Sequence, residues 1–202
     1  NCVIPTSKFT LVPAPLYDPG KKDEYFTFNN NLEEGNIVLV NKVVDPDAFL
    51  VYSASKPVFD LINSLYPGVH PYHHIKLLLD YTSSGRKSGN GNYIHVHIER
   101  DFFNLIVFNN NILKFCNSFT YRNISDILYY VLNVFKNLVI KQEETIYFSG
   151  LTEKYDDLSS GFSLYIRNIK FAEPSGNFTF SYVFNDLELH RFLNLFTAVN
   201  CE

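Results

Sequence analysis

The segment IHVHIERD, at residues 94–101, carries side chains of the types and spacing that could do chemistry. His95, His97 and Glu99 stand at every second position, and side chains two residues apart in a strand point to the same face. Two imidazoles and one carboxylate on a common face are ligands that zinc accepts, and HPYHH at 70–74 supplies three further histidines. This spacing raises a metal-dependent hydrolase as one hypothesis.

The residues between these histidines support a second interpretation of the segment. Ile94, Val96 and Ile98 form an aliphatic row, and burying that row forces the intervening side chains onto the opposite face of the strand. Nothing in the sequence brings the HPYHH histidines to this strand. We therefore expect His95 and His97 to be neutral and hydrogen-bonded, with no bound metal or other cofactor. Replacing both by Gln is then expected to cost within about 1 kcal/mol.

Composition and charge narrow the class of protein. The chain has 202 residues, of which 46% are hydrophobic, enough to build a core for one large or two small domains. Its formal net charge of −4 argues against a nucleic-acid binder, which would carry a basic face. We expect neither a membrane span nor a signal peptide, because no apolar run of about 18–20 residues and no basic-then-apolar start is visible. Three widely spaced cysteines form no disulfide framework, so we expect a cytoplasmic protein.

Turn residues divide the chain into two parts. TSSGRKSGNGN at 82–92 is small, polar and rich in Gly, which predicts a flexible linker between a front part, 1–81, and a back part, 93–202. The front part is predicted to be α+β, because β-branched runs alternate with helical spacing. Its predicted strands are 8–12, 36–43 and 48–54, and its predicted helices are 56–66 and 74–81.

The back part has the stronger pattern. Strands are predicted at 93–99, 103–108 and 112–119, and the short turns between them favour an antiparallel meander. Crossovers follow, and the next strand is expected to run parallel to the first. The later predicted elements are a helix at 125–138 capped by Ser125, a strand at 144–150, a helix at 156–169, a strand at 178–184 and a closing helix at 186–199. This order predicts an α/β, ribonuclease-H-like half-domain.

The hairpin VHIERDFFNLIVFNNNIL, at 96–113, resembles the second phosphate-loop hairpin of actin-like ATPases. In this resemblance His97 stands where that family has Asp. The triplet ERD at 99–101 stands on its glycines, and Phe102 stands at or beside its Thr. The match needs no gap, and it implies an actin-like fold for the back part.

A second motif, YFSGL at 147–151, resembles the nucleoside-side LxGG segment of the same ATPases. Ser149 stands in place of the first Gly, and Gly150 is retained. Together the two resemblances imply degenerate nucleotide-binding positions at His97, Glu99, Arg100, Asp101 and Gly150.

The departures from the ATPase motif bear on activity. An actin-like phosphate loop needs a carboxylate to hold Mg²⁺ through water, glycines whose backbone N–H groups close on phosphate oxygens, and a hydroxyl group. Here an imidazole, charged side chains and an aromatic ring stand in their place. A carboxylate a few ångström from a triphosphate costs on the order of 1 to 4 kcal/mol. We therefore expect a pseudo-ATPase without nucleotide hydrolysis.

Further stretches are similar to an uncharacterised Bacteroidetes-type family of unknown function with this actin-like fold. They are FTLVPAPLYD (9–18), EYFTFN (24–29), SLYPGVHPYHH (64–74), CNSFTYRNISDILYYVLNVF (116–135) and HRFLNLFTAVNCE (190–202). None is a catalytic signature, so the resemblance indicates a bacterial family and leaves activity open. Members of that family have strands before the equivalent of residue 1. Their absence here, together with the absence of Met, favours a fragment, omitted methionines or a shorter relative.

The sequence therefore predicts a non-catalytic actin-like protein, an interaction or scaffold module with protein partners. Two alternatives stay open: a nucleotide-binding actin-like ATPase, and a metal-dependent hydrolase that uses Glu99, Asp101 and the histidines. Candidate partner contacts are His190, Arg191 and Glu202, because a guanidinium fork often binds carboxylates at interfaces.

Overall fold

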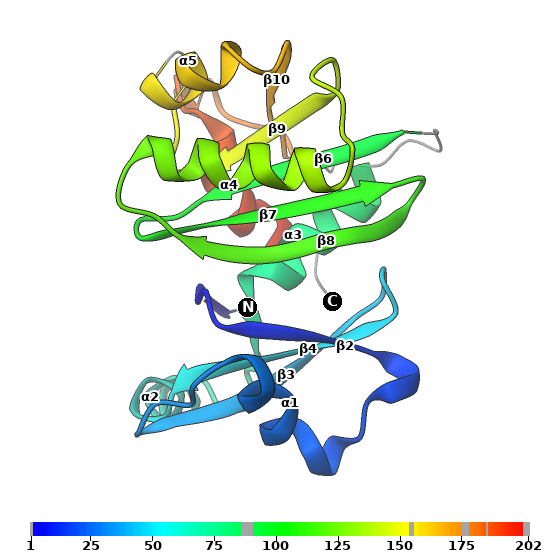
Figure 1. Ribbon diagram of the computed structural model, residues 1–202. Coiled ribbons are helices and arrows are strands. Elements are labelled where there is room, and N and C mark those ends of the chain that lie inside the picture. The colour runs from blue at the N-terminus through cyan, green and yellow to red at the C-terminus, as the bar shows by residue number, and fades with distance from the viewer. Residues whose placement is uncertain (1, 86–90, 154–155, 175–177, 185, 200–202) are drawn as a thin grey trace. The chain divides into compact units, whose positions relative to one another are not determined.

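The computed structural model divides the chain into two compact units, residues 1–85 with 197–202 and residues 86–196 (Figure 1). It describes residues 2–85, 91–153, 156–174, 178–184 and 186–199. Within these residues no helix has both the length and the apolar composition that a membrane span requires.

The first unit is built on a three-stranded antiparallel sheet in the order β2-β4-β3. Its strands are β2 (Phe9–Pro13), β3 (Asn36–Val43) and β4 (Ala48–Ser55). Helix α1 (Lys22–Asn29), which the sequence analysis did not predict, adds Phe26 to a small core with Val12, Val38 and Val51. The strands predicted at 36–43 and 48–54 are confirmed as β3 and β4, which pair antiparallel with Val40 opposite Val51.

The remaining elements of the first unit include a helix that extends into the predicted linker at 82–92. They are β1 (Cys2–Ile4), η1 (Ala14–Leu16), η2 (Pro19–Lys21), α2 (Lys56–Leu65), β5 (Pro71–His73) and α3 (His74–Gly85). Strand β5 pairs in parallel with β1. Because α3 continues to Gly85, the first four residues of the predicted linker are helical, and residues 86–90 lie outside the described residues. Hydrogen bonds from Thr82 Oγ1 to the Leu79 carbonyl and from Ser83 Oγ to the Asp80 carbonyl hold this polar turn within the helix.

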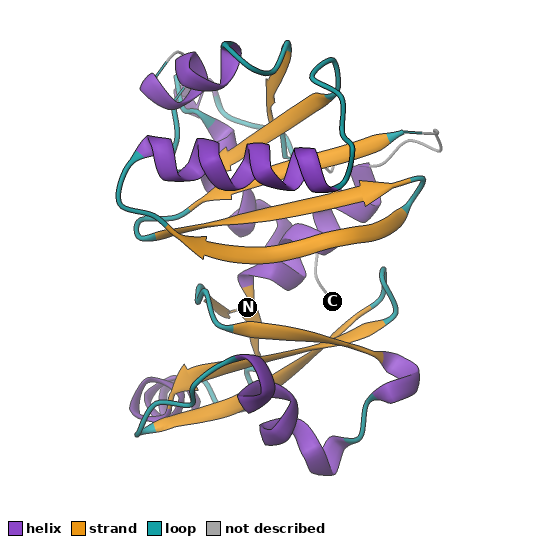
Figure 2. Ribbon diagram, viewed as in Figure 1, coloured by secondary structure: helices purple, strands orange, loops and turns teal. Residues whose placement is uncertain are grey.

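The second unit contains a five-stranded sheet in the order β10-β9-β6-β7-β8 (Figure 2). Its strands are β6 (Asn92–Ile98), β7 (Phe102–Asn109), β8 (Ile112–Thr120), β9 (Thr145–Gly150) and β10 (Asn168–Phe171). Strands β6, β7 and β8 form the predicted antiparallel meander, and β9 lies parallel to β6. The predicted ribonuclease-H-like strand order is therefore confirmed.

Helix α4 (Ile124–Asn137) lies across one face of this sheet and closes its core (Figures 1 and 2). The predicted aliphatic row Ile94, Val96 and Ile98 is buried in that core. The helix begins one residue earlier than predicted, because Asn123 and Asp126 form a capping box. Asp126 N–H donates to Asn123 Oδ1 at 3.1 Å, and Asp126 Oδ2 accepts from Asn123 N–H at 3.3 Å. Asn123, and not Ser125, is therefore the N-cap.

Three predictions for the last third of the chain were wrong. The helix predicted at 156–169 is shorter, because α5 (Asp157–Ser163) ends and Asn168–Phe171 joins the sheet as β10. The strand predicted at 178–184 is absent from its described residues, which end in η3 (Tyr182–Phe184). The closing helix starts only with η4 (Leu189–Phe192) and α6 (Leu193–Val199). Packing decides the second case, because the rings of Phe178 and Phe180 both lie 5.3 Å from the Phe196 ring.

The capping box at the start of α4 can be tested by substitution. Replacing Asn123 by Ala leaves helix N–H groups unpaired and is expected to lower the free energy of unfolding by about 1 kcal/mol in urea titration. Ser125→Ala, at an exposed position inside the first turn, is the matched control and should stay within about 0.5 kcal/mol of the wild type. A larger cost for the Ser125 variant than for the Asn123 variant would contradict the assigned cap.

Candidate functional site

A buried polar cluster lies where β6 and β9 run side by side toward their carboxyl ends. The parallel register pairs His97 with Ser149 and His95 with Tyr147. Ser149 Oγ lies 2.7 Å from His95 Nε2 and 2.7 Å from His97 Nδ1. The exposed fractions of His95, His97 and Ser149 are 0%, 2% and 0%. The alternation in IHVHI does mark the two faces of a strand, but both faces are buried, so an inexpensive exchange of both histidines is no longer expected.

The cluster continues from His97 toward the protein surface. His97 Nε2 lies 3.1 Å from Glu99 Oε1 and 3.1 Å from the side-chain amide of Asn194, which α6 supplies. The Glu99 side chain is 23% exposed. Sequence reasoning missed Asn194, because no local pattern connects a residue of the closing helix with a strand 97 positions earlier.

Counting protons assigns a direction to the hydrogen bonds. A carboxylate only accepts, so His97 Nε2 carries the proton that faces Glu99, and Nδ1 of the same ring is an acceptor. The Ser149 hydroxyl then donates to His97 Nδ1 and accepts from His95 Nε2–H. The Asn194 side-chain amide lies beside the same His97 nitrogen, at 3.1 Å from Nε2.

The electrostatics of the cluster keep His95 neutral. Burial, and next the neighbouring His97 ring, lower the pKa of His95 to about 3. A neutral imidazole that carries its proton on Nε2 matches the hydrogen bond from His95 to Ser149. The expectation of hydrogen-bonded histidines is thus confirmed, because a nitrogen of each ring lies 2.7 Å from Ser149 Oγ.

The loop at the phosphate-loop position is a tight hairpin connection. The Glu99 backbone N–H donates to the Phe102 carbonyl at 2.9 Å, and the Tyr121 hydroxyl donates to the Glu99 carbonyl at 2.7 Å. Arg100 and Asp101 are exposed at the tip. The backbone N–H that a phosphate cradle would use at Glu99 is therefore already bonded within the hairpin.

Gly150 has a structural explanation at the end of β9. Its φ is +84°, and a Cβ built there would lie 2.1 Å from the Ile98 carbonyl oxygen. The next residue, Leu151, donates its N–H to that same oxygen at 2.8 Å. The close approach of β9 to β6 thus requires glycine at this position.

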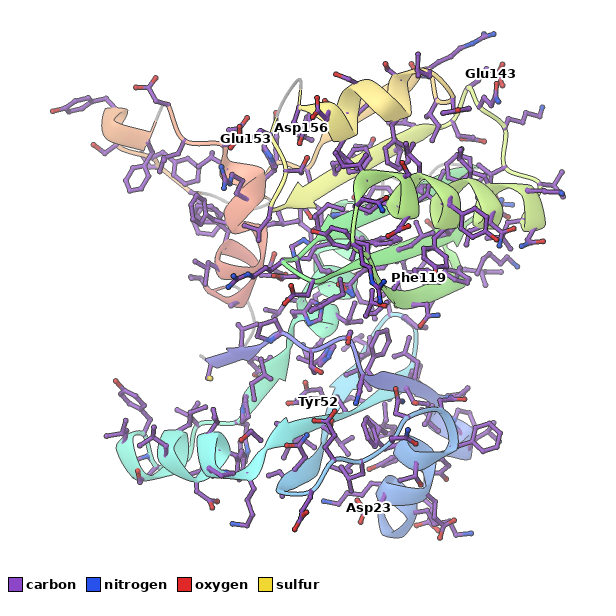
Figure 3. All side chains as sticks on the ribbon, turned by 60° about the vertical axis from the view of Figure 1, so that its left-hand side comes forward. Asp23, Tyr52, Phe119, Glu143, Glu153 and Asp156 are labelled. Carbon is purple, nitrogen blue, oxygen red and sulfur yellow. The ribbon has the colours of Figure 1, made fainter. Side chains whose placement is uncertain are left out.

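The C-terminal segment covers the loop that follows β9. His190 is buried, and its Nε2 lies 2.8 Å from the Thr152 carbonyl oxygen. Arg191 Nη1 forms an ion pair with Glu153 Oε1 at 3.0 Å, and Figure 3 labels Glu153 beside this segment. Two of the three predicted partner contacts therefore make internal bonds, and Glu202 lies outside the described residues.

The same loop is held by Asp156, the N-cap of α5 (Figure 3). Its carboxylate accepts from Ser159 N–H at 2.7 Å, Glu153 N–H at 3.0 Å and the Thr152 hydroxyl at 2.9 Å. Burial raises the pKa of Asp156, but these hydrogen bonds outweigh it and hold the pKa below its usual value. The loop is thus bonded from both sides.

The cluster has the side chains of a proton relay, but its hydroxyl group, that of Ser149, is buried. Ser149, His97 and Glu99 follow the order of hydroxyl, imidazole and carboxylate that activates a serine. However, Ser149 is fully buried, so a substrate atom cannot approach its oxygen in this conformation. Within the described residues, no three His, Cys, Asp or Glu side chains form a group that could hold a metal ion.

The histidines of HPYHH belong to the first unit. His73 is buried, with Nε2 lying 3.0 Å from the Thr6 carbonyl oxygen and Nδ1 accepting from Ile75 N–H at 3.1 Å. Burial, and next the neighbouring His74, hold the pKa of His73 well below its usual value. These contacts give the ring a structural role at the start of α3.

Comparison with known proteins identifies the fold. The profile of a family described as "Protein of unknown function (DUF3822)" matches residues 1–169. A crystal structure from Bacteroides thetaiotaomicron, of a protein with actin-like ATPase fold and unknown function, is similar with a TM-score of 0.83 and 21% identity, over 99% of this chain and 72% of that chain. No curated protein gave a significant match.

A second similar structure is a PilM-PilN type IV pilus biogenesis complex. Its TM-score is 0.57 and its identity 12%, over 98% of this chain and 78% of that chain. The predicted actin-like α/β fold is confirmed by both structures, and identities this low identify the fold alone.

Gly35 and Gly150, two of the glycines with positive φ, have different surroundings and give a matched test of the β6–β9 junction. Gly35→Ala, at φ +80° with no atom within 4 Å of the added Cβ, should cost about 1–2 kcal/mol of unfolding free energy. Gly150→Ala adds a backbone clash at 2.1 Å and should cost roughly 3–5 kcal/mol. Equal costs in chemical denaturation would show that the two strands do not approach as described.

The lowered pKa of His95 predicts a pH dependence of stability. The unfolded chain binds a proton at His95 below about pH 6.5, whereas the folded chain excludes it until about pH 3. His95 should therefore remove about 1.4 kcal/mol of stability per pH unit as the pH falls through this window. His95→Gln should flatten that slope in urea titrations at pH 6.5, 5.5 and 4.5, after subtraction of its own cost at neutral pH.

His70→Gln, at an exposed histidine, is the control for the pH experiment and should keep the wild-type slope. An unchanged slope in the His95 variant would mean that the imidazole is protonated in the folded state.

Proposed function

The chain belongs to the DUF3822 family of proteins of unknown function, and we propose that it is a non-catalytic actin-like interaction or scaffold module. The observation that carries this proposal is the filling of the site between β6 and β9 by the chain's own side chains. His97 is hydrogen-bonded there to Ser149 and to Asn194, and His97 and Ser149 are almost completely buried.

The position of this cluster matters because of sheet topology. In open α/β sheets, ligands bind beyond the carboxyl ends of parallel strands, where the chain leaves neighbouring strands in opposite directions. In this sheet that point lies between β6 and β9, since β6 leads to β7 on one side and β9 leads to β10 on the other. His190 and Arg191 bond to the loop after β9, so the C-terminal segment also lies at this end of the sheet.

The charges at the hairpin also disfavour nucleotide. Glu99 and Asp101 both stand on the loop that would face the phosphates, and the Glu99 backbone N–H is already bonded to Phe102. Each carboxylate near a triphosphate would cost on the order of 1 to 4 kcal/mol. A protein with this arrangement is better suited to hold a partner than to turn over ATP.

A similarity of fold supports the proposal that this chain binds partner proteins. One similar structure comes from a complex of two proteins, and an actin-like fold can serve as an assembly platform when its own site is filled. A cytoplasmic, bacterial setting is part of the proposal, supported by the free thiols of Cys2 and Cys116 and by the Bacteroides thetaiotaomicron relative.

Isothermal titration with Mg-ATP tests the proposal. We expect no dissociation constant tighter than millimolar for the wild type. The double variant Glu99→Gln, Asp101→Asn should also fail to bind, because removing the charges leaves the Glu99 N–H bonded within the hairpin and the cluster filled. An active actin-like ATPase titrated in parallel is the positive control.

A micromolar dissociation constant for the wild type would overturn the non-catalytic proposal in favour of a rebuilt nucleotide site. Binding only by the double variant would retain the proposal for the natural chain and identify charge as the main obstacle.

A further inference from the structure

The sheet of the second unit ends in a strand whose outer edge has no partner among the described residues. Strand β10 pairs with β9 on one side, and Ala172 N–H donates to the Phe148 carbonyl at 2.8 Å on that side. Because successive residues of a strand direct their backbone groups to alternate edges, those of Ile169 and Phe171 face away from β9. In the part of the chain that the structure describes, no backbone group bonds to them.

A pocket of about 880 Å³ runs along this free edge. Ile169 and Phe171 line it from β10, and serines of α5 line it from a second side. Segment 186–190, which carries two acidic residues, lines the pocket from a third side. The outward backbone groups of Ile169 and Phe171, which have no backbone partner among the described residues, therefore face a groove large enough to admit an extended segment.

The chain's own strand-like segment does not fill this place. Residues 178–184 alternate aromatic and smaller side chains, yet their described residues form no strand, and Phe178 and Phe180 pack on Phe196. Natural proteins cover, charge or shorten free edges, because such edges accept further strands. Among the described residues no further strand pairs with this edge, and it lies beside a groove, which is the arrangement of a strand-addition site.

The charged residues that line the groove indicate which kind of strand it would bind. Among the described residues that line it, Glu173, Asp186 and Glu188 are acidic and Lys170 is basic, and the rings of Phe171 and Phe180 supply apolar surface. A second copy of this chain would bring the same acidic groove against itself, which like-charge repulsion disfavours. A segment that alternates apolar residues with Lys or Arg would fit both the rings and the carboxylates.

We propose that the groove along β10 binds an extended, basic segment of a partner protein, which adds to the sheet as a further strand. This inference rests on the proposed function as an interaction module, and it names the surface and the chemistry of the partner. Main-chain hydrogen bonds to Ile169 and Phe171 would supply affinity, and the carboxylates would select basic side chains.

The experiment uses a displayed library of random ten-residue peptides, selected against the full chain. We expect enrichment of sequences that alternate apolar with Lys or Arg. The strongest peptide is then synthesised with a fluorescent label and titrated by anisotropy. A copy with N-methyl groups on alternate backbone nitrogens keeps every side chain but cannot add to a sheet edge, and it should bind at least tenfold more weakly.

Two charge reversals locate the binding surface. Asp186→Lys, at an exposed residue of the groove, should weaken binding of the selected peptide at least fivefold. Asp23→Lys, on α1 of the first unit and labelled in Figure 3, is the matched control and should leave binding unchanged. Circular dichroism melting confirms that both variants are folded.

Several outcomes would overturn the groove proposal. They are a failure to enrich any peptide, equal binding of the N-methylated copy, binding that Asp186→Lys leaves unchanged, and sedimentation that shows a dimer weakened by the same variant. Each of these leaves the proposed function standing if Mg-ATP still fails to bind. Micromolar Mg-ATP binding would remove the proposed function whatever the peptides do.

Discussion

The parallel contact between the ends of β6 and β9 constrains everything around it. Leu151 N–H bonds to the Ile98 carbonyl, and the close approach of the strands leaves no room for a side chain at Gly150. This contact fixes Ser149 directly beside His97 in the register. It therefore decides that the two imidazoles of β6 meet a hydroxyl group and not one another or a solvent face.

The geometry of that junction shows that the strand order and the polar cluster depend on different residues. The strand order needs only the aliphatic row of β6 and the packing of α4, which are independent of the residues at the strand ends. Those end residues are then free to form a hydrogen-bonded cluster. Once buried, the cluster is costly to open, because each polar group removed from its partner loses about 1–3 kcal/mol.

The C-terminal segment has two roles in the second unit. Through His190, Arg191 and Asn194 it bonds to the loop after β9 and to the cluster on β6. Through Asp186 and Glu188 it forms one wall of the groove along β10. A partner bound in that groove would therefore contact the same C-terminal segment that bonds to the cluster.

Much of the fold could be predicted from the sequence, because it depends on local periodicity. The row Ile94, Val96 and Ile98, the short turns of the meander and the helical stripe of 125–138 each specify an element through neighbouring residues alone. The charged triplet at 99–101, where the resembled ATPases have glycines, could also be identified from the sequence alone. Predictions failed after residue 156, where short segments with aromatic residues can form strand or helix and packing makes the choice.

By itself the sequence thus determined the strand order, the actin-like resemblance and the alternation that separates the histidines from the core aliphatics. Only the tertiary structure decided what the histidines do. Ser149 lies 52 residues from His97 and Asn194 lies 97 residues from it, and no local rule encodes such contacts. Burial of both faces of β6 and the hydrogen bonds of the cluster arise from long-range contacts, because they depend on which strands become neighbours.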